Sequence, residues 1–520
     1  MKRLSVIALV FAVFAAQDAS ATDWFWFGRG ADTLWTTKEN WSTTSNEYTA
    51  ATAYPNSKNN TYIYVNTAHS ESHSFTITIP ASFDGSVFTS LCIYDDESPG
   101  AVTIVGEGDT RIKIPSPNST SIKWSGADHP MTLTLRNFNL EGYNVTPIYN
   151  SCDGNGFCID NCSYDSTGQN TYLKLPPGNG GKLVIVDSAI TNRWVKRPSN
   201  TDYGSVTFAV TNSFLSLKSY TISGTNAVVD LCNSTLQVTE ASFFGTTSTS
   251  TDNNKEEDVP GMKIGFHRCT ILWAGAATGN STVLWTRSAG REFTFEDSEL
   301  TLVGSATLKS VFGGNSNDVT RLKNSSLYFS ASHEDKGTIY LDNSQWVTTN
   351  GTTSGTAPLR YVISGASPVL NPGRWQFGSQ KPVYLDFIVP KGGYSNPPLN
   401  FEAYADDLTK DVWGGNCGHP NPGEINVLPE SPAINAPETI ICPLIYRKAL
   451  RTNLSRCLPT TLPNEKSKFL VTTDYSWEYN EVNGKAESDW TEVAVGYNSN
   501  VAGVAVKIVG LKPGLSIFVR

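Results

Sequence analysis

Apolar and polar residues alternate along the middle of the chain, and a short polar corner interrupts the alternation at regular intervals. Residues 293–302, with the sequence FTFEDSELTL, show the unit: two alternating apolar residues, the corner Asp297, a serine, and two more alternating apolar residues. An alternation of period two predicts extended strands with one buried face. The unit occurs nine times, about every 26 residues, a spacing typical of repeat architectures; its corners are Asn137, Asn161, Asp187, Asn212, Asn233, Arg268, Asp297, Asn324 and Asn343.

A corner that leaves the alternation intact predicts a second strand around the same interior. We therefore expect an all-β chain folded as a right-handed parallel β-helix, a solenoid whose coils of about 26 residues pair each strand with its equivalents in the coils on either side. Asn and Asp tolerate left-handed backbone, so the corners should stack into a ladder of side chains. The next residue is Ser in six copies and Cys in two, Cys162 and Cys269, which predicts a column of small buried residues.

Two other architectures share part of this pattern. A leucine-rich repeat has the same period, but it needs a helical segment in each repeat, whereas connecting stretches such as residues 246–251 and 348–356 are rich in Ser, Thr and Gly. An array of antiparallel sandwiches is the other alternative. Corner spacings that vary from 19 to 35 residues favour coils with loops of variable length.

The two ends of the chain differ from the repeats. Residues 1–21 have the features of a signal peptide: a basic start, an apolar run and a small-residue site for cleavage after Ala21. An uncleaved anchor is the alternative, although the run is short for a bilayer, and no other stretch predicts a transmembrane segment. We expect a secreted or cell-surface protein with a β-helix and aromatic cap over residues 22–437, a Pro- and Cys-containing linker over 438–465, and a small β unit over 466–520. A short helix is expected near residues 444–454.

Composition and net charge limit the classes of binding partner that the protein is expected to have. The net charge is −9, the pI is about 5.3, and only 17% of the residues are charged. This balance argues against a nucleic-acid-binding or membrane-surface protein.

Nine cysteines leave at least one without a disulfide partner. Cys162 and Cys269 are expected to be buried thiols in the small-residue column. Cys152 and Cys158 flank a turn-forming run and are candidates for a disulfide. The remaining candidates for pairing, in the Pro-rich region, are Cys417, Cys442 and Cys457.

The mature N-terminus is unusually rich in aromatic residues. We expect them to cap the open end of the first coil; a carbohydrate-binding platform is the alternative. The spacing of Gly28, Trp35, Asn40 and Trp41 resembles the N-terminus of exported bacterial β-helix proteins, often surface or autotransporter-passenger-like ones.

A second resemblance lies near the end of the repeats. Residues 428–436, LPESPAINA, are similar to the SPAIDAG ending near the last coil of right-handed parallel β-helix proteins of the pectin-lyase-like class. Asn435 stands where Asp is usual, and Pro437 where Gly is usual. The resemblance implies a fold and no particular chemistry.

A basic and aromatic run follows the Asp187 corner, and its members are Arg193, Trp194, Lys196 and Arg197. Such a patch can hold an anionic glycan by charge pairing and stacking; a solvated loop is the alternative. Lys263, His267, Arg268, Arg287 and Arg291 extend the basic set several coils later.

Two further sets of residues are candidate sites. Asp153, Asn155 and Asp160 are candidate calcium ligands, because their oxygens are close in sequence; turn formation is the competing explanation. No other cofactor is expected. Asp95 and Asp96, followed by Arg111 and Lys113, superficially resemble polygalacturonase motifs, but that family's flanking segments are missing.

The sequence therefore predicts an exported structural or adhesive β-helix protein that binds polysaccharides or cell-surface glycans along its lateral face. The alternative is a polysaccharide lyase or glycoside hydrolase of the same fold, with residues 193–197 near its cleft.

Overall fold

The chain is described by a computed structural model. It describes residues 23–509 except 46, 57–62, 67–72, 84–89, 96–99, 109–111, 116–120, 127–128, 142–143, 148–152, 166–171, 177–178, 197–204, 223–225, 240–242, 245–261, 275–290, 304–307, 313–316, 331–332, 349–351, 373–374, 378–382, 401–421, 431–438, 447–460, 495–496 and 498–500. The proposed signal peptide lies outside these residues.

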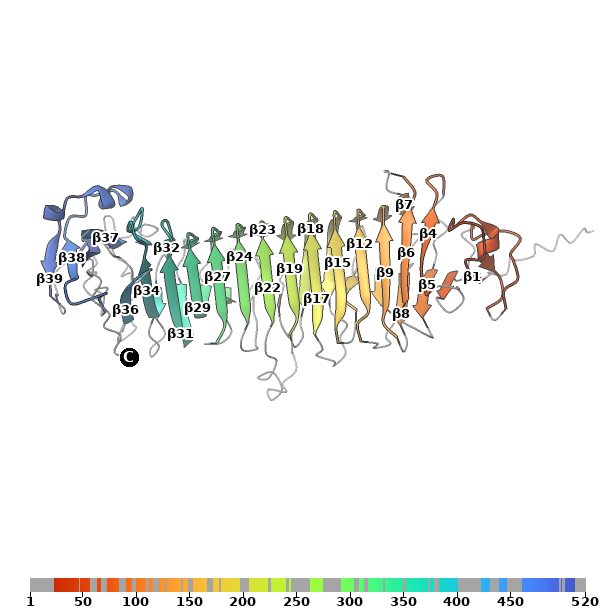
Figure 1. The fold of residues 1–520 in the computed structure, drawn as a ribbon, viewed down its shortest axis with the longest axis horizontal. Helices are drawn as coiled ribbons and strands as arrows, with labels where there is room; N and C mark the ends of the chain where they lie inside the picture. Colours follow the sequence, from red (N-terminus) through yellow and green to blue (C-terminus); the bar gives the residue numbers. More distant parts are fainter. Residues whose placement is uncertain are drawn as a thin grey trace, which may run out of the picture.

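The described residues form an elongated stack of parallel strands (Figure 1). One face, sheet B, is an unbroken series in which each strand pairs in parallel with the next. Its strands are β4 (Ser74–Ile79), β6 (Gly100–Gly106), β9 (Met131–Arg136), β12 (Gly156–Asp160), β15 (Gly181–Val186), β17 (Val206–Thr211), β19 (Val228–Cys232), β22 (Lys263–His267), β24 (Glu292–Glu296), β27 (Val319–Lys323), β29 (His333–Asp342), β31 (Thr352–Ser364), β34 (Val383–Val389) and β36 (Pro422–Pro429), with β26 (Leu308–Phe312) and β33 (Trp375–Phe377) beside β29 and β31.

The other strands belong to sheet A, and the early coils contribute two strands each to it. These strands are β1 (Trp24–Trp26), β2 (Trp41–Ser42), β3 (Ile63–Asn66), β5 (Ser90–Asp95), β7 (Ile112–Pro115), β8 (Ser121–Gly126), β10 (Phe138–Glu141), β11 (Asn144–Pro147), β13 (Ser163–Asp165), β14 (Tyr172–Lys174), β16 (Ala189–Lys196), β18 (Phe214–Ile222), β20 (Thr235–Val238), β21 (Phe243–Phe244), β23 (Thr270–Trp273), β25 (Glu299–Leu302), β28 (Ser326–Phe329), β30 (Gln345–Thr348), β32 (Val369–Asn371), β35 (Leu399–Asn400) and β37 (Thr439–Tyr446). Pairing between coils is parallel, which argues against the antiparallel sandwich array.

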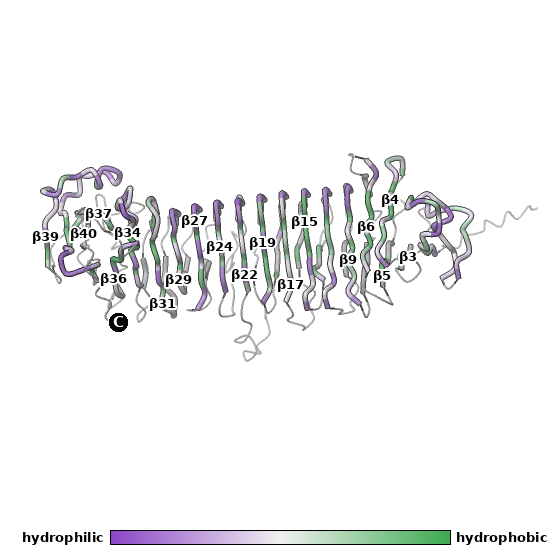
Figure 2. The backbone as a smooth tube through the Cα atoms, in the orientation of Figure 1, coloured by the Kyte–Doolittle hydropathy of each residue, from purple (hydrophilic) through white to green (hydrophobic). Residues whose placement is uncertain are grey.

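The corners between the sheets have the predicted backbone. All nine corner residues adopt left-handed φ values between 47° and 64°. Their side chains form hydrogen-bonded runs: Asn161 donates to Asn137 at 2.8 Å, and Asn233 donates to Asn212 at 3.2 Å. The hydrophilic corners form a line along one edge of the stack (Figure 2).

The column of small residues after the corners is also confirmed. In six places a backbone amide donates to the hydroxyl of the equivalent serine in the next coil, at 3.0 or 3.1 Å; the donors are Cys162, Ser188, Ser213, Cys269, Ser298 and Ser325. These serines and Cys162 and Cys269 are buried. A hydroxyl is small enough for the interior and gives each corner amide an acceptor that the sheet ladder does not supply.

The apolar positions of each coil point inward and stack on their equivalents. Leu183, Phe208, Val229, Ile264 and Phe293 form one such register column, and all are buried. Because every coil adds a similar set, one continuous core runs through the stack.

The N-terminal tryptophans lie inside the first coils. Trp26, Trp35 and Trp41 are no more than 2% exposed, and Trp41 Nε1 donates to the carbonyl of Trp35 at 2.7 Å. Strand β1 pairs in parallel with β3 and antiparallel with β2. These rings cover the end of the core, so their faces are not free to stack on a carbohydrate.

At the other end the strand direction changes. Strand β37 pairs in parallel with β35 and antiparallel with β40 (Gly503–Val509), which also pairs antiparallel with β38 (Lys468–Thr472); β39 (Thr491–Val493) completes the unit. Tyr446, Trp477 and Trp490 form its separate small core. The helix predicted near residues 444–454 is wrong for 444–446, which continue β37; Leu444 and Ile445 are buried in the main core, and Tyr446 in the small one. Residues 447–454 are not described.

Helices are scarce in the described part of the chain, where they comprise the 3₁₀ segments η1 (Lys38–Asn40), η6 (Tyr479–Gly484) and η7 (Glu487–Asp489). The leucine-rich repeat alternative is therefore wrong for the described coils. No helix among the described residues is long and apolar enough to span a membrane.

The disulfide predicted between Cys152 and Cys158 is not formed. Cys158 is a half-buried free thiol in β12, where it points away from the core between Phe157 and Ile159. Cys442 is also free, and full burial raises the pKa of its thiol to about 12. Cys152, Cys417 and Cys457 lie outside the described residues.

Candidate functional site

The predicted anionic-glycan patch lies on sheet A. Arg193, Trp194 and Lys196 belong to β16, and Arg197 is not described. A register shift at Arg193 interrupts the pairing of β16 with β18. The patch is thus largely part of a strand, and the alternative of a solvated loop is wrong for residues 193–196.

The strand register places two further residues beside this patch, and the sequence analysis did not identify them. Strand β14 pairs with β16 so that Tyr172 is opposite Trp194 and Lys174 is opposite Lys196. Val195, between the two β16 residues, is buried. Two aromatic and two basic residues therefore occupy adjacent register positions in neighbouring coils.

The three candidate calcium ligands serve the fold in different ways. Asp153 and the buried Asn155 each accept a backbone amide from another coil, at 2.7 and 2.8 Å. Asp160 accepts a hydrogen bond of 2.6 Å from Arg136 Nε. Among the described residues no group of three His, Cys, Asp or Glu side chains could hold a metal ion. Calcium binding stays a prediction.

The remaining sequence candidates are dispersed. Asp95 ends β5 and Lys113 lies in β7, whereas Asp96 and Arg111 are not described. Of the second basic set, Lys263, His267 and Arg268 lie at the surface, and Arg287 is not described.

Arg291 is not part of a surface patch, contrary to the sequence prediction. Its side chain is buried, and Nη1 lies 3.5 Å from Oδ2 of the equally buried Asp318. Burial lowers the pKa of Arg291 to about 10, while Asp318 opposes that shift. Arg291 precedes β24 on the inward side of the coil, where a neutralising carboxylate is required.

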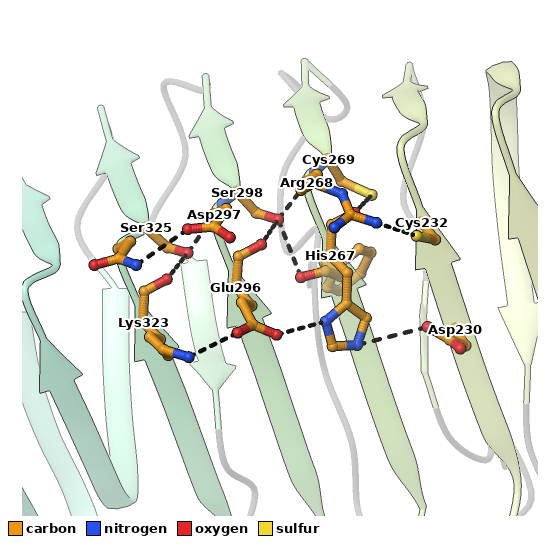
Figure 3. Close-up of polar contacts among 12 residues, drawn as sticks. Asp230, Cys232, His267, Arg268, Cys269, Glu296, Asp297, Ser298, Lys323 and Ser325 are labelled. Carbon is orange, nitrogen blue, oxygen red and sulfur yellow. Dashed lines mark hydrogen bonds and ion pairs between the residues drawn. The ribbon is translucent and has the colours of Figure 1, made fainter.

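A row of polar side chains crosses the exposed face of sheet B (Figure 3). Register pairs Cys232, His267, Glu296 and Lys323 in consecutive strands β19, β22, β24 and β27. His267 Nδ1 lies 3.3 Å from Glu296 Oε2, and Lys323 Nζ donates to Glu296 Oε1 at 2.9 Å. The row is therefore bonded across three coils.

Asp230 joins this row diagonally. His267 Nε2 lies 3.7 Å from Asp230 Oδ1, although Asp230 faces Gly265 in the register. A Cβ atom at Gly265 would lie 2.9 Å from His267 Nε2. The missing side chain lets the imidazole lie across the strand, between two carboxylates.

The charged side chains of this row stabilise one another's ionised forms. The hydrogen bond from Lys323 and, to a smaller extent, the one with His267 lower the pKa of Glu296 below its usual value. The same bond raises the pKa of Lys323. Both side chains are solvent-exposed, so screening limits what these shifts contribute to stability.

The corner next to the row carries Arg268 in place of Asn or Asp. Arg268 Nε donates to Asn233 Oδ1 at 2.5 Å, and Nη2 lies 3.3 Å from Cys232 Sγ. Its φ of 54° is unusual for a long side chain. Arg268 thus donates toward the preceding coil as the asparagines do.

A shallow, open groove of about 400 Å³ follows this corner. Polar side chains from three coils line most of it, among them Arg268, Thr270, Asp297, Glu299, Asn324 and Ser326. It lies beside the His267 row, at the junction of sheets A and B (Figure 3).

The sequence contained signals for much of this site. Counting back from each corner predicts that Cys232, His267, Glu296 and Lys323 share one outward column. The approach of His267 to Asp230 across the strand was indicated in the sequence only indirectly, by the glycine at position 265.

Comparisons with family models, curated proteins and solved structures returned no match to this chain.

Proposed function

We propose that the chain is an exported, right-handed parallel β-helix protein of the pectin-lyase-like kind that works at the cell surface or outside the cell, where it binds glycans along its lateral faces. The observation that carries this proposal is the uninterrupted parallel stack, whose outward residues repeat at the same positions in successive coils. A repeating flat face can meet a repeating polymer at several places at once, so that weak contacts add up.

The register of β14 and β16 supports an anionic glycan on one part of this surface. Tyr172 and Trp194 supply two aromatic residues, and Lys174 and Lys196 supply two cations, at adjacent positions. Aromatic faces stack on sugar rings, and ammonium groups pair with carboxylate or sulfate groups.

Catalysis on a polysaccharide is the second candidate function, and His267 is the observation that favours it. An imidazole between Asp230 and Glu296 is the kind of side chain that can act as a general acid or base. Both carboxylates already face His267, however, and Glu296 also bonds Lys323. Neither is poised as a separate general acid, so binding is the better supported function.

Retention on polysaccharides tests the proposal. The full chain would be incubated with pectin, alginate and chondroitin sulfate, and with cellulose, chitin, xylan and mannan, and the bound fraction measured at low and high salt. We expect retention on at least one polymer, with anionic polymers released by salt. Trp194→Ala and Lys196→Ala should weaken anionic binding, whereas Lys263→Ala, on sheet B, should not.

The same incubations test the alternative. Ultraviolet absorbance of unsaturated products and a reducing-sugar assay would reveal a lyase or a hydrolase. Turnover that disappears in His267→Ala would replace binding with catalysis as the main function. No retention on any polymer, with no products, would reject both.

A further inference from the structure

We propose that the groove beside Arg268, Asp297 and Glu299 is a subsite for a neutral, hydroxyl-rich sugar ring. This inference rests on the proposed glycan-binding function and names the part of the lateral surface that makes the contact. It concerns a different place and a different class of glycan from the β14–β16 patch.

The corner ladder breaks at this groove for a chemical reason. Along the ladder the corners Asn161, Asn212, Asn233 and Asn324, and Arg268, each donate to the corner of the preceding coil, as Asn324 does to Asp297 at 3.1 Å. Arg268 has donors and no acceptor, and an ionised Asp297 has acceptors and no donor. Asp297 therefore cannot donate to Arg268, and the Arg268 guanidinium donates to Asn233 and Cys232 of the preceding coil, so no side-chain bond joins these two corners.

The break leaves polar atoms directed at solvent. The ladder uses Nε of Arg268 and Oδ1 of Asp297, and Nη2 of Arg268 donates to Cys232 Sγ beside the ladder. Within the described residues, Arg268 Nη1, Asp297 Oδ2 and the exposed Glu299 carboxylate take part in no ladder bond. A guanidinium and two carboxylates at the edges of one groove can donate to and accept from neighbouring sugar hydroxyls at the same time.

The charge of the groove selects the class of ligand. Two carboxylates outnumber the one guanidinium, so a uronic acid or a sulfated sugar would meet net repulsion. A neutral ring presents hydroxyls, which can donate to Asp297 and Glu299 and accept from Arg268 and from the Asn324 amide. We therefore assign a neutral saccharide to this groove.

Apolar surface lies next to these groups on sheet A. Thr270 and Ser326 line the groove, and two residues further along the same strands, on the same outward face, lie Leu272 and Tyr328, each 37% exposed. Tyr328 Oη donates to Gln345 Oε1 at 3.0 Å, which fixes its ring. A polar groove bordered by an aromatic face matches the two sides of a sugar ring, its hydroxyl edge and its C–H face.

At this left-handed corner arginine is less favourable for the fold than asparagine. Asparagine would adopt the left-handed corner more readily and could also accept a hydrogen bond. The other eight corners of the described coils are Asn or Asp. An arginine that disfavours its own backbone conformation indicates a role outside the ladder.

Isothermal titration of the full chain with neutral and anionic oligosaccharides tests the inference. The probes are hexasaccharides of glucose, xylose, mannose and N-acetylglucosamine, with oligogalacturonate as the anionic comparison. We expect at least one neutral probe to bind, and Arg268→Asn and Glu299→Gln each to weaken it by about tenfold or more. Arg268→Asn should fold at least as stably as the wild type, since it restores the usual corner residue.

Asp187→Asn is the matched control, because Asp187 is also a corner carboxylate that accepts from the next coil, at 3.2 Å. It should leave binding unchanged. Neutral binding that is equally strong in Arg268→Asn and Glu299→Gln would overturn the groove assignment and leave glycan binding intact, as would binding of oligogalacturonate alone. If no saccharide or polysaccharide binds, the proposed function itself fails.

Discussion

The backbone amide of Ser188 donates a hydrogen bond of 3.0 Å to the hydroxyl of Ser213 in the next coil, and that hydroxyl donates to the carbonyl of Thr211 at 2.7 Å. One buried hydroxyl thus satisfies two backbone groups, and it links two coils at the point where the chain turns from sheet B to sheet A. The same arrangement recurs along the serine column, so the corners add directional bonds to a stack that is otherwise held by apolar packing and strand pairing.

Ser213→Ala should destabilise the protein by about 1–3 kcal/mol, because the buried Ser188 amide loses its acceptor. Urea unfolding followed by circular dichroism would measure the change. Ser213→Cys, which copies Cys162 and Cys269, should cost less. Ser216→Ala, on the outward face, is the control and should be near neutral; an equal loss in both alanine variants would contradict the role given to the column.

Leu300→Asp should unfold the neighbouring coils, with a loss of about 4 kcal/mol or more, because it places an unpaired charge where the side chain is 1% exposed. Thermal unfolding would detect it. Leu272→Asp introduces the same charge at an outward position that is 37% exposed, and it should be tolerated. Unchanged thermal stability in Leu300→Asp would refute the assignment of this face to the core.

Asp318→Ala should cost about 3–5 kcal/mol, because it removes the carboxylate that neutralises the buried Arg291. The double variant Arg291→Met and Asp318→Ala should recover part of this loss, since it leaves no buried cation. Denaturant midpoints of the single and double variants make the comparison. Asp160→Ala, at the exposed pair with Arg136, should change stability by less than about 1 kcal/mol.

The Glu296–Lys323 pair should make stability depend on pH at both extremes. The folded-state pKa of Glu296 lies below 4.5, so its contribution is present above that value and is lost as pH falls through the folded pKa. The folded-state pKa of Lys323 lies above 10.5, so its contribution is present below that value and is lost as pH rises through the folded pKa.

Carboxylate titration by NMR would measure the Glu296 pKa directly. It should rise in Lys323→Met and, to a smaller extent, in wild type at high salt. An unchanged value in Lys323→Met would show that the pair is not formed in solution.

Thiol labelling should separate the cysteines by position. Cys269 and Cys442 are buried, and burial raises the pKa of each, so neither should react with N-ethylmaleimide until the protein unfolds. Cys232, half-buried on the face of sheet B beside Arg268, should react in the native state. Peptide mapping by mass spectrometry distinguishes them; rapid native labelling of Cys269 would contradict the buried column.

The amino-acid sequence by itself determined the parallel stack, its corners and its core. Alternation sets which side chains point inward, and a left-handed corner needs residues such as Asn324 that tolerate positive φ, so both features follow from local backbone preferences. Small residues such as Ser298 were recognisable because a tight buried column admits nothing larger.

Only the tertiary structure decided which outward residues meet. Stacking makes neighbours of strands from different coils. The loops between these strands vary in length, so the local sequence does not predict which outward residues pair. The pairing of Tyr172 with Trp194 is an example. The absent side chain at Gly265 turns His267 toward Asp230. Arg291 looked like a surface cation because its neutralising partner, Asp318, comes from the next coil, and long-range pairing rather than local pattern determines where a charge can be buried.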